Sequence, residues 1–369
     1  MSKTALITIT VIVAVVAAIS AIVLFVRSRK RRKLANVLDR RDNDSVHYAF
    51  IINPSKPQAA EHRRFIASYC ANHGFNDIEF IETQLDKDGR VCAQGALAHG
   101  AEVVVAVGGD GTVRTVASAM AGTGHALGIV PIGTGNLCAR NMGIPVGDIE
   151  AALTVATSHG SRNVDMGRMA ILDNKNEDHG HAFLIIAGIG FDAAMIDDTD
   201  PELKKNISWL AYFVGGVKNL FAPKYHGTVT ITSADGSTHS RSGLTFRTFM
   251  AGNCGEIPMF SLMPSASVDD GILDFEIIDT TGGIIGWTNL FGDIVYQTVT
   301  RKPEQNPISI SSKVDQIQGI SAELTLEKPA LAEADGDILG ESQHIRISVE
   351  KHALIVRVPE VPTAAGKTA

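Results

Sequence analysis

The sequence predicts an α/β domain followed by a mostly antiparallel β domain, with a transmembrane helix ahead of both. Three observations support this fold class. Strand-like and helix-like segments alternate from residue 46 to about 166, which is typical of a parallel sheet covered by helices. Beyond that point, strand-like runs bounded by Gly, Asn and Asp predominate. An uncharged aliphatic run, Ala5–Val26, stands near the amino terminus.

The length and composition fit this division. With 369 residues, of which 45% are hydrophobic and 20% charged, the chain is long enough for two domains with their own cores. The four cysteines are far apart and form no C-x-x-C pair, so we expect reduced, buried thiols rather than a zinc site. The expected segments are a transmembrane helix 5–26, a basic juxtamembrane linker 27–45, an α/β domain 46–166 completed by about 343–360, a β-sandwich 167–342 and a disordered tail 361–369.

The amino-terminal run is long enough to cross a bilayer as a helix, which takes about 20 residues. It is followed at once by R-S-R-K-R-R-K, residues 27–33. Cations after the span orient its carboxyl side toward the cytoplasm, and they would also bind anionic lipid head groups. A cleaved signal peptide is the alternative, but its charge would precede a shorter apolar core. We therefore expect a single-pass protein of the cell (inner) membrane with a cytoplasmic catalytic body.

The charge is divided unevenly along the chain. The net charge is −7, yet residues 1–41 hold nine Lys or Arg and one acid, so the remainder carries about −15. Proteins that bind nucleic acid neutralise phosphates with cations. An acidic body therefore argues against nucleic acid as a partner.

The α/β segments can be justified in chain order. Each apolar run has either a strand-like or a helix-like period, and Gly, Asn or Asp separates it from the next. Strands are expected at 46–52, 77–83, 101–107 and 127–131, and helices at 61–74, 88–100 and 112–122.

Two glycine loops follow two of these strands. Gly-Gly-Asp-Gly-Thr, 108–112, links a buried strand to a helix, and Gly-Thr-Gly-Asn, 133–136, follows the next strand. Ligands bind at the carboxyl edge of open α/β sheets, and free N–H groups at a helix start attract phosphate. A structural turn is the alternative for each loop alone. Together they predict a nucleotide site, in which phosphate is held by Gly108, Gly109, Gly111 and Thr112 and nucleotide by Thr134 and Asn136.

The second domain is expected to consist of two packed antiparallel sheets. Its strand-like runs are 181–193, 227–233, 244–253, 271–279, 308–312 and 322–328. Helical character is expected only around 201–221 and 284–300.

Several motifs together resemble the catalytic domain of the diacylglycerol kinase family. They are the turn Asn53-Pro54 after the first strand, G-G-D-G-T, P-x-G-T-x-N, the segment D-D-G-x-L-D at 269–274 and D-G-D at 335–337. The similarity extends over about residues 46–360. It implies an NAD-kinase-like, three-layer α/β nucleotide domain and a β-sandwich domain for the lipid substrate.

The resemblance also implies roles for individual residues. ATP would be held by the glycine loops with Asn53 and Lys56, and Mg²⁺ by Asp270 and Asp274. Asp335 would be the general base, with Asp337 beside it as a further catalytic carboxylate. Asp110 would act through Mg²⁺ on the phosphates, or serve as the base in place of Asp335. Without the resemblance, both acidic motifs would be interpreted as turns.

The chain departs from the family pattern at identifiable positions. N-P-x-S/A-G is N-P-S-K-P here, so Lys56 stands where glycine amides usually meet phosphate. G-G-D-G-T is usually followed by x-N-E, whereas this chain has Val113-Arg114-Thr115. The usual D-G-E is D-G-D, so Asp337 replaces a glutamate. Leu137 stands after Asn136 in place of an acidic residue.

The expected function is ATP-dependent phosphorylation of a lipid hydroxyl in the membrane, with diacylglycerol giving phosphatidic acid for phospholipid biosynthesis. A sphingoid base, a phospholipid head group or a glycolipid is the alternative acceptor. The sequence is also compatible with an NAD kinase and with a membrane-tethered nucleotide or lipid sensor without turnover. It is compatible with a homodimer as well, and does not decide the oligomeric state.

Overall fold

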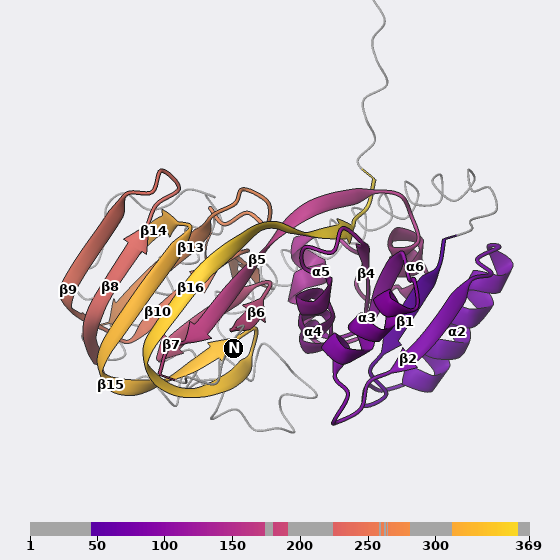
Figure 1. Ribbon diagram of the computed structural model, residues 1–369, viewed down its shortest axis with the longest axis horizontal. Helices are drawn as coiled ribbons and strands as arrows, with labels where there is room; N and C mark the ends of the chain where they lie inside the picture. The colour runs from indigo at the N-terminus through magenta and orange to yellow at the C-terminus, as the bar shows by residue number, and fades with distance from the viewer. Residues whose placement is uncertain are drawn as a thin grey trace, which may run out of the picture. The chain divides into compact units, whose positions relative to one another are not determined.

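The computed structural model describes residues 46–173, 180–190, 224–257, 260–261, 263, 265–280 and 312–360 (Figure 1). The helical segments expected at 201–221 and 284–300 lie outside these ranges, as does the expected strand at 308–311.

The amino-terminal half contains the predicted parallel sheet. Its strands lie in the order β4-β3-β1-β2, and every neighbouring pair is parallel. The strands are β1 (Tyr48–Ile52), β2 (Ile78–Glu82), β3 (Val103–Gly108) and β4 (Ala126–Pro131). The helices are α2 (Ala59–Asn72), α3 (Gly89–Ala98), α4 (Asp110–Met120), α5 (Leu137–Asn141) and α6 (Ile149–Ala156).

Side-chain pattern and capping explain these elements. β1, β3 and β4 are buried along their whole length, as expected for central strands of a sheet covered on both faces. Asp88 and Asp148 start α3 and α6, since their carboxylates accept the N–H groups of Val91 and Ala151. One apolar cluster, which includes Phe50, fills the space between sheet and helices.

The carboxyl-terminal half is built of antiparallel strands. They are β5 (Ser161–Ile171), β6 (His181–Phe183), β7 (Ile186–Gly190), β8 (Tyr225–Thr232), β9 (Thr238–Phe246), β10 (Thr248–Gly252), β13 (Leu273–Thr280), β14 (Ser312–Gly319), β15 (Ser321–Ala334) and β16 (Asp337–Arg357). A separate two-stranded sheet pairs β11 (Glu256–Ile257) with β12 (Phe260–Ser261).

The described strands of the two halves belong to one sheet of fourteen strands. The connection is β16, the long strand that crosses the structure in Figure 1. It pairs with β15 and β5 in antiparallel fashion, and near its end Ile355 and Val356 pair with β4 in parallel. The mixed α/β architecture predicted from the sequence is confirmed. The antiparallel strands do not form a separate main sheet, however, because β16 joins them to the parallel sheet by hydrogen bonds.

This continuous sheet folds over a core of its own. One apolar cluster includes Ile231 of β8, Phe246 of β9, Phe275 of β13 and Ile347 of β16. β15 pairs with β8 through its first half and with β7 through its last residues. Parts of one sheet therefore face each other across the core. The four cysteines are free and buried, as their spacing predicts.

The predicted location in the inner membrane is not retained. No helix within the described ranges combines the length and the apolar character that a bilayer crossing requires. The predicted span, 5–26, and the basic run proposed to bind anionic head groups, 27–33, lie outside those ranges.

A buried carboxylate that the sequence did not single out joins three segments of the β-rich half. Asp165 of β5 is fully buried. Its oxygens accept N–H groups from Gly271 and from His352, each at 2.6 Å. Gly271 belongs to the D-D-G turn before β13, and His352 lies at an irregularity in the pairing of β16. Asp165 therefore fixes both segments to β5.

Replacing Asp165 with Asn is expected to lower the free energy of unfolding by about 1–3 kcal/mol, because an amide NH₂ would face one of the two buried donors. Urea denaturation measures this loss. Asp173→Asn is the matched control, since Asp173 also accepts two N–H groups of β16, from Gln343 and His344, but is exposed. Equal losses in the two variants would contradict the expectation.

Candidate active site

Three loops meet at the carboxyl edge of the parallel sheet. They follow β1, β3 and β4, and we refer to them as the Asn53 loop (53–57), the first glycine loop (108–112) and the second glycine loop (133–136). The amide of Asn53 donates to the Thr112 hydroxyl at 3.3 Å and its carbonyl oxygen accepts from Ser55. The Asn53 loop is therefore tied to the first glycine loop.

The two glycine loops touch through their backbones. A Cβ on Gly133 would lie 2.5 Å from the Cα of Gly109, closer than real Cβ atoms come to other heavy atoms. A Cβ on Gly109 would lie 3.7 Å from Nζ of Lys56, so that ammonium group is also beside the loop. Glycine is needed at 109 and 133 because each loop occupies the space of the other's side chain.

Gly108 and Gly111 differ in their surroundings. A Cβ on Gly108 would collide with the side chain of Thr112, whereas no atom of another described segment lies within 4 Å of the equivalent position on Gly111. Glycine is therefore needed at 108 because of a side chain in the same loop. Gly111 is exposed at the first turn of α4 and leaves its backbone accessible.

Two side chains predicted to contact the nucleotide form hydrogen bonds within the loops instead. The Asn136 side chain is buried, and both of its polar atoms bond Gly133, accepting from its N–H at 3.0 Å and donating to its carbonyl at 2.7 Å. Asn136 has a left-handed backbone (φ 50°), which these bonds stabilise. The Thr112 side chain is also buried and faces Asn53. Thr134 is exposed. In this structure, Asn136 and Thr112 shape the loops.

Asp110 links the two glycine loops. It is the first residue of α4, and its carboxylate accepts the N–H of Cys138 at 3.1 Å, in the first turn of α5. The other carboxylate oxygen lies 3.1 Å from the position of a Cβ on Gly135, so glycine there leaves room for it. Asp110 therefore holds the start of α5 against the start of α4.

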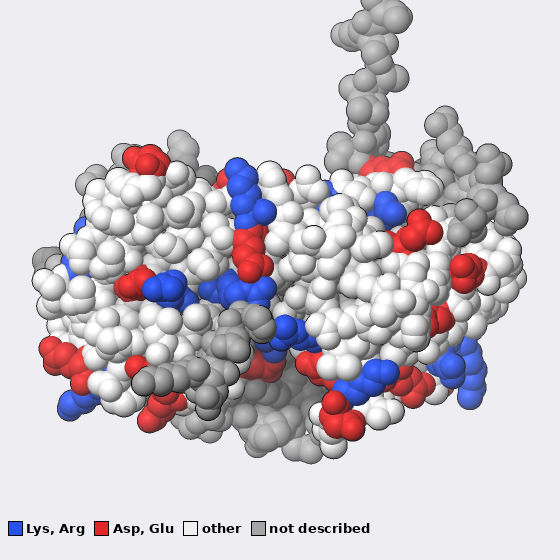
Figure 2. Space-filling view, in the orientation of Figure 1, with Lys and Arg blue, Asp and Glu red and all other residues white. Residues whose placement is uncertain are grey.

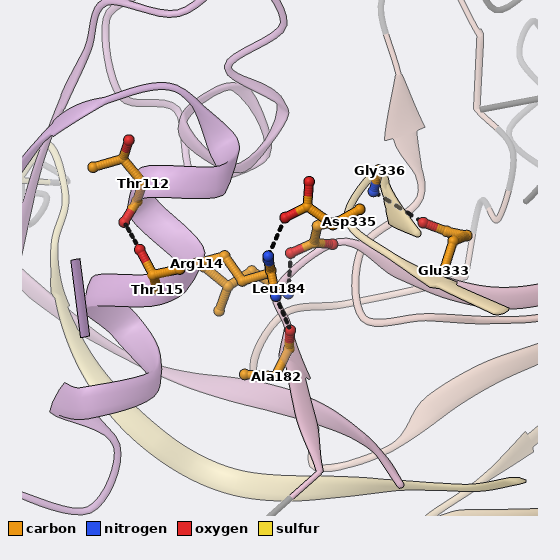
Figure 3. Close-up of polar contacts among 9 residues, drawn as sticks. Thr112, Arg114, Thr115, Ala182, Leu184, Glu333, Asp335 and Gly336 are labelled. Carbon is orange, nitrogen blue, oxygen red and sulfur yellow. Dashed lines mark hydrogen bonds and ion pairs between the residues drawn. The ribbon is translucent and has the colours of Figure 1, made fainter. Parts of the chain in front are cut away.

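The predicted D-G-D motif is a hairpin turn, and that turn positions a carboxylate. Asp335 and Gly336 connect β15 to β16, and both have positive φ, 48° and 87°, as a two-residue type I′ turn requires. The Asp335 carboxylate accepts three backbone N–H groups. That of Leu184 lies at 2.7 Å (Figure 3), and those of Ile185 and Ile186 lie at 2.9 Å and 3.0 Å. Glu333 holds the turn by accepting the N–H of Gly336.

The environment of Asp335 opposes its ionisation. Burial raises the pKa of Asp335 to about 6, although the three backbone hydrogen bonds and the charge of Arg114 act in the opposite direction. A carboxylate offers about four acceptor positions, of which the three N–H groups take three. One acceptor position on Oδ2 thus remains for a hydroxyl group.

Arg114 of α4 links the hairpin of Asp335 to the helix that begins in the first glycine loop. Its guanidinium donates to the carboxylate of Asp337, and at 3.5 Å to the carbonyl of Ala182 in β6. Burial raises the pKa of the Cys138 thiol, and the negative charges of Cys254, Asp110 and Asp335 raise it further. The structure therefore ties the hairpin that carries the predicted base, Asp335, to α4. Asp337 has a different setting, since it is about half exposed and its carboxylate is paired with Arg114.

The predicted metal ligands lie on and before β13. Asp270 is exposed and caps its own turn by accepting the N–H of Ile272. Asp274 is buried, and its Oδ1 accepts amide protons from Gln316 and Gln318 of β14, while its Oδ2 has no partner among the described residues. Within the described ranges, no three His, Cys, Asp or Glu side chains gather as a ligand set for a metal ion.

Sequence reasoning missed three features of this site. The N–H groups of Leu184 to Ile186 carry no sequence signal, because backbone donors are not visible in a sequence. Nothing in the sequence indicates that the buried Glu333 accepts the N–H of Gly336. Arg114 was visible as a departure from the family pattern, but its partners were not.

Comparisons with known proteins identify the family of this chain. The family model for the diacylglycerol kinase catalytic domain matches residues 47–169. A probable YegS-like lipid kinase of Xanthomonas axonopodis pv. citri is 30% identical over 282 residues, which cover 73% of this chain and 84% of that protein. A diacylglycerol kinase of Bacillus subtilis is 29% identical over 179 residues, which cover 48% of this chain and 55% of that protein.

A solved structure shares the fold. The crystal structure of a diacylglycerol kinase from Bacillus anthracis superposes with a TM-score of 0.64 at 22% identity, over 85% of this chain and 97% of that one.

Proposed function

We propose, from the premise that this chain belongs to the lipid kinase family that shares the diacylglycerol kinase catalytic domain, that it transfers the γ-phosphoryl group of ATP to the hydroxyl of diacylglycerol. The observation that carries the proposal is the Asp335 carboxylate, which is held by three backbone N–H groups on a hairpin that Arg114 ties to α4, with one acceptor position left. Its pKa of about 6 suits a general base near neutral pH.

The remaining requirements of phosphoryl transfer are few. The reaction depends mainly on positioning and on neutralising phosphate charge. The backbone around Gly109, Gly111 and Gly133 would approach the triphosphate, and the Lys56 ammonium beside Gly109 would contribute positive charge. Asp335 would accept the proton of the lipid hydroxyl as that oxygen attacks the γ-phosphorus.

The choice of acceptor follows from the relatives. The relative from Bacillus subtilis is named a diacylglycerol kinase, whereas the relative from Xanthomonas is named only as a probable lipid kinase. Diacylglycerol is therefore the first acceptor to test, ahead of a sphingoid base, a phospholipid head group and a glycolipid. On the face in Figure 2, basic and acidic side chains are interspersed, which supports a partner other than nucleic acid.

The residues present fit a divalent cation at the β13 position. Mg²⁺ is usually bound by one or two carboxylates with water completing its shell. Asp274 offers a buried oxygen without a partner. Burial, and to a lesser extent the negative charge of Asp274, raises the pKa of the neighbouring Glu276 to about 8. Asp274 and Asp270 would hold the ion, whose chemistry when bound is to neutralise negative charge and order this turn.

Magnesium is expected to stabilise the protein through Asp274. At a hundredfold excess over its Kd, a ligand adds about 2.7 kcal/mol to the stability. Thermal unfolding with and without MgCl₂ measures this, and Asp274→Asn should abolish the shift. The control is Asp279→Asn, which removes a carboxylate of β13 that is paired with Lys224. An equal Mg²⁺ shift in all three proteins would exclude a site at Asp274.

A labelled-ATP assay tests the proposed function. The purified protein is incubated with [γ-³²P]ATP, Mg²⁺ and mixed micelles that contain diacylglycerol, sphingosine, a phospholipid or a glycolipid, and in a separate reaction with NAD. Label in phosphatidic acid supports the proposal, and label in another lipid changes the acceptor. Label in NADP would replace it with an NAD kinase, and the absence of ATP consumption with every acceptor would favour a sensor.

A further inference from the structure

We propose that Arg114 is a positioning residue, which ties the Asp335–Asp337 turn to the first turns of α4 and so keeps the Asp335 carboxylate directed at the glycine loops. This inference rests on the proposed function for its kinetic consequences, whereas its structural content stands independently of turnover.

Arg114 joins three elements. It lies on α4 one helical turn after Asp110, so both side chains project from the same face of the helix. Its guanidinium donates to the carboxylate of Asp337, the first residue of β16, and at 3.5 Å to the carbonyl of Ala182 in β6. Figure 3 shows Arg114 extending from α4 toward Asp335. The α4 face thus holds the second glycine loop through Asp110 and the hairpin through Arg114.

The burial of Arg114 distinguishes this contact from an ordinary surface ion pair. Only 12% of its side chain is exposed. Its Nε is buried and has no hydrogen-bond partner in the part of the chain that the structure describes. An arginine held in this way has little freedom to adopt another arrangement, and its planar fork fixes direction as well as charge.

Two departures from the family pattern meet in this contact. Arg114 stands where the pattern has asparagine, and Asp337 stands where it has glutamate. Aspartate is one methylene shorter than glutamate, and arginine is several bonds longer than asparagine. The longer side chain on α4 reaches the shorter carboxylate on β16, so the two substitutions compensate each other in length, and Arg114 adds a positive charge opposite that carboxylate.

Arg114 also acts on Asp335 electrostatically. Its positive charge lowers the pKa of Asp335 and partly offsets the desolvation that raises it. Among the described residues, the other titratable groups around this carboxylate include Cys138 of α5, Cys254, Asp110 of α4 and, on its own hairpin, Glu333 and Asp337. Arg114 adds a positive charge to this group.

The test combines kinetics with hydrogen–deuterium exchange in the full-length protein. The variants are Arg114→Gln, Asp337→Asn, the double variant and Arg114→Lys. For Arg114→Gln we expect kcat with diacylglycerol to fall about a hundredfold, the loss typical of a misplaced reacting group, while KM for ATP changes less than about twofold. The lower limb of the pH profile should shift to higher pH, and the amides of 184–186 should exchange faster. Arg114→Lys should restore part of kcat.

The double variant tests whether the two residues act together. If Arg114 works through Asp337, the double variant loses no more kcat than Arg114→Gln alone. The control is Arg346→Gln, which breaks the Arg346–Glu323 pair between β15 and β16, far along both strands from the turn. Its kcat, pH profile and exchange at 184–186 should match the wild type.

Several outcomes would overturn the proposal. A large rise in KM for ATP with unchanged kcat would make Arg114 a nucleotide contact. Additive losses in the double variant, or unchanged exchange at 184–186 in Arg114→Gln, would show that the tie does not position Asp335. If the wild type phosphorylates no acceptor, the proposed function fails, and the exchange measurement still decides whether Arg114 holds the turn.

Discussion

Asp335→Asn is expected to lower kcat for lipid phosphorylation by about 10²–10⁴-fold, the range typical of a lost general base. An amide at this position cannot accept a proton from the attacking hydroxyl. The variant retains an oxygen for the N–H groups of Ile185 and Ile186, so the turn keeps two of its three anchors. The assay is single-turnover transfer of labelled phosphate at saturating ATP.

The pH profile of the wild type gives a second test of the same assignment. Asp335 acts in its charged form, and its pKa is about 6. Activity should therefore be full above about pH 7 and fall about tenfold per unit as the pH drops below 6. The acidic limb should be absent in Asp335→Asn, whose residual rate does not depend on this proton.

Asp110→Asn separates the two candidates for the base. Asp110 holds the N–H of Cys138, and its other oxygen faces the second glycine loop. Its replacement should weaken ATP binding together with turnover, because the nucleotide side of the site changes. Asp335→Asn should bind ATP as the wild type does. If instead Asp110→Asn binds ATP normally and loses all turnover, Asp110 is the base and the role of Asp335 is structural.

The glycine loops show how far sequence reasoning reached. A strand, a glycine loop and a helix succeed one another in the chain, so the loops could be placed at one edge of a parallel sheet. The hydrogen bonds within the loops could not be predicted. Asn136 and Thr112 have polar groups suited to a nucleotide, yet both are engaged by neighbouring loop residues in the structure. A sequence shows which groups a residue offers and leaves open which partner takes them.

The D-G-D motif shows a different limit. The sequence presented a turn and a catalytic carboxylate as alternatives, whereas the structure contains a type I′ turn whose conformation directs Asp335 toward three backbone donors. Those donors lie about 150 residues earlier in the chain. Likewise, the sequence predicts that residues 343–360 complete the α/β domain, but not that β16, by pairing with β4, joins the parallel sheet and the antiparallel strands into one sheet. Long-range contacts of this kind have no local signature.

Gly133→Ala is expected to weaken ATP binding by about 10–100-fold, because the added methyl group forces the two glycine loops apart. Its nearest neighbours would be the Cα of Gly109 at 2.5 Å and Oδ1 of Asn136 at 2.8 Å. The first is backbone, which moves only with its loop, and such overpacking costs about 1–3 kcal/mol. Isothermal titration with a non-hydrolysable ATP analogue measures the change.

Two further glycine variants isolate the cause. Gly95→Ala is the control, since no atom of another described segment lies within 4 Å of a Cβ there, and helix α3 should gain up to about 1 kcal/mol of stability. Gly111→Ala likewise meets no such atom within the described ranges, so weaker ATP binding in that variant would come from a collision with the ligand itself. Loss of affinity in Gly133→Ala and Gly111→Ala, with Gly95→Ala unaffected, would place the triphosphate on these loops. Normal affinity in both variants would mean that the nucleotide binds elsewhere, because a methyl group added to each glycine loop would then leave ATP binding unchanged.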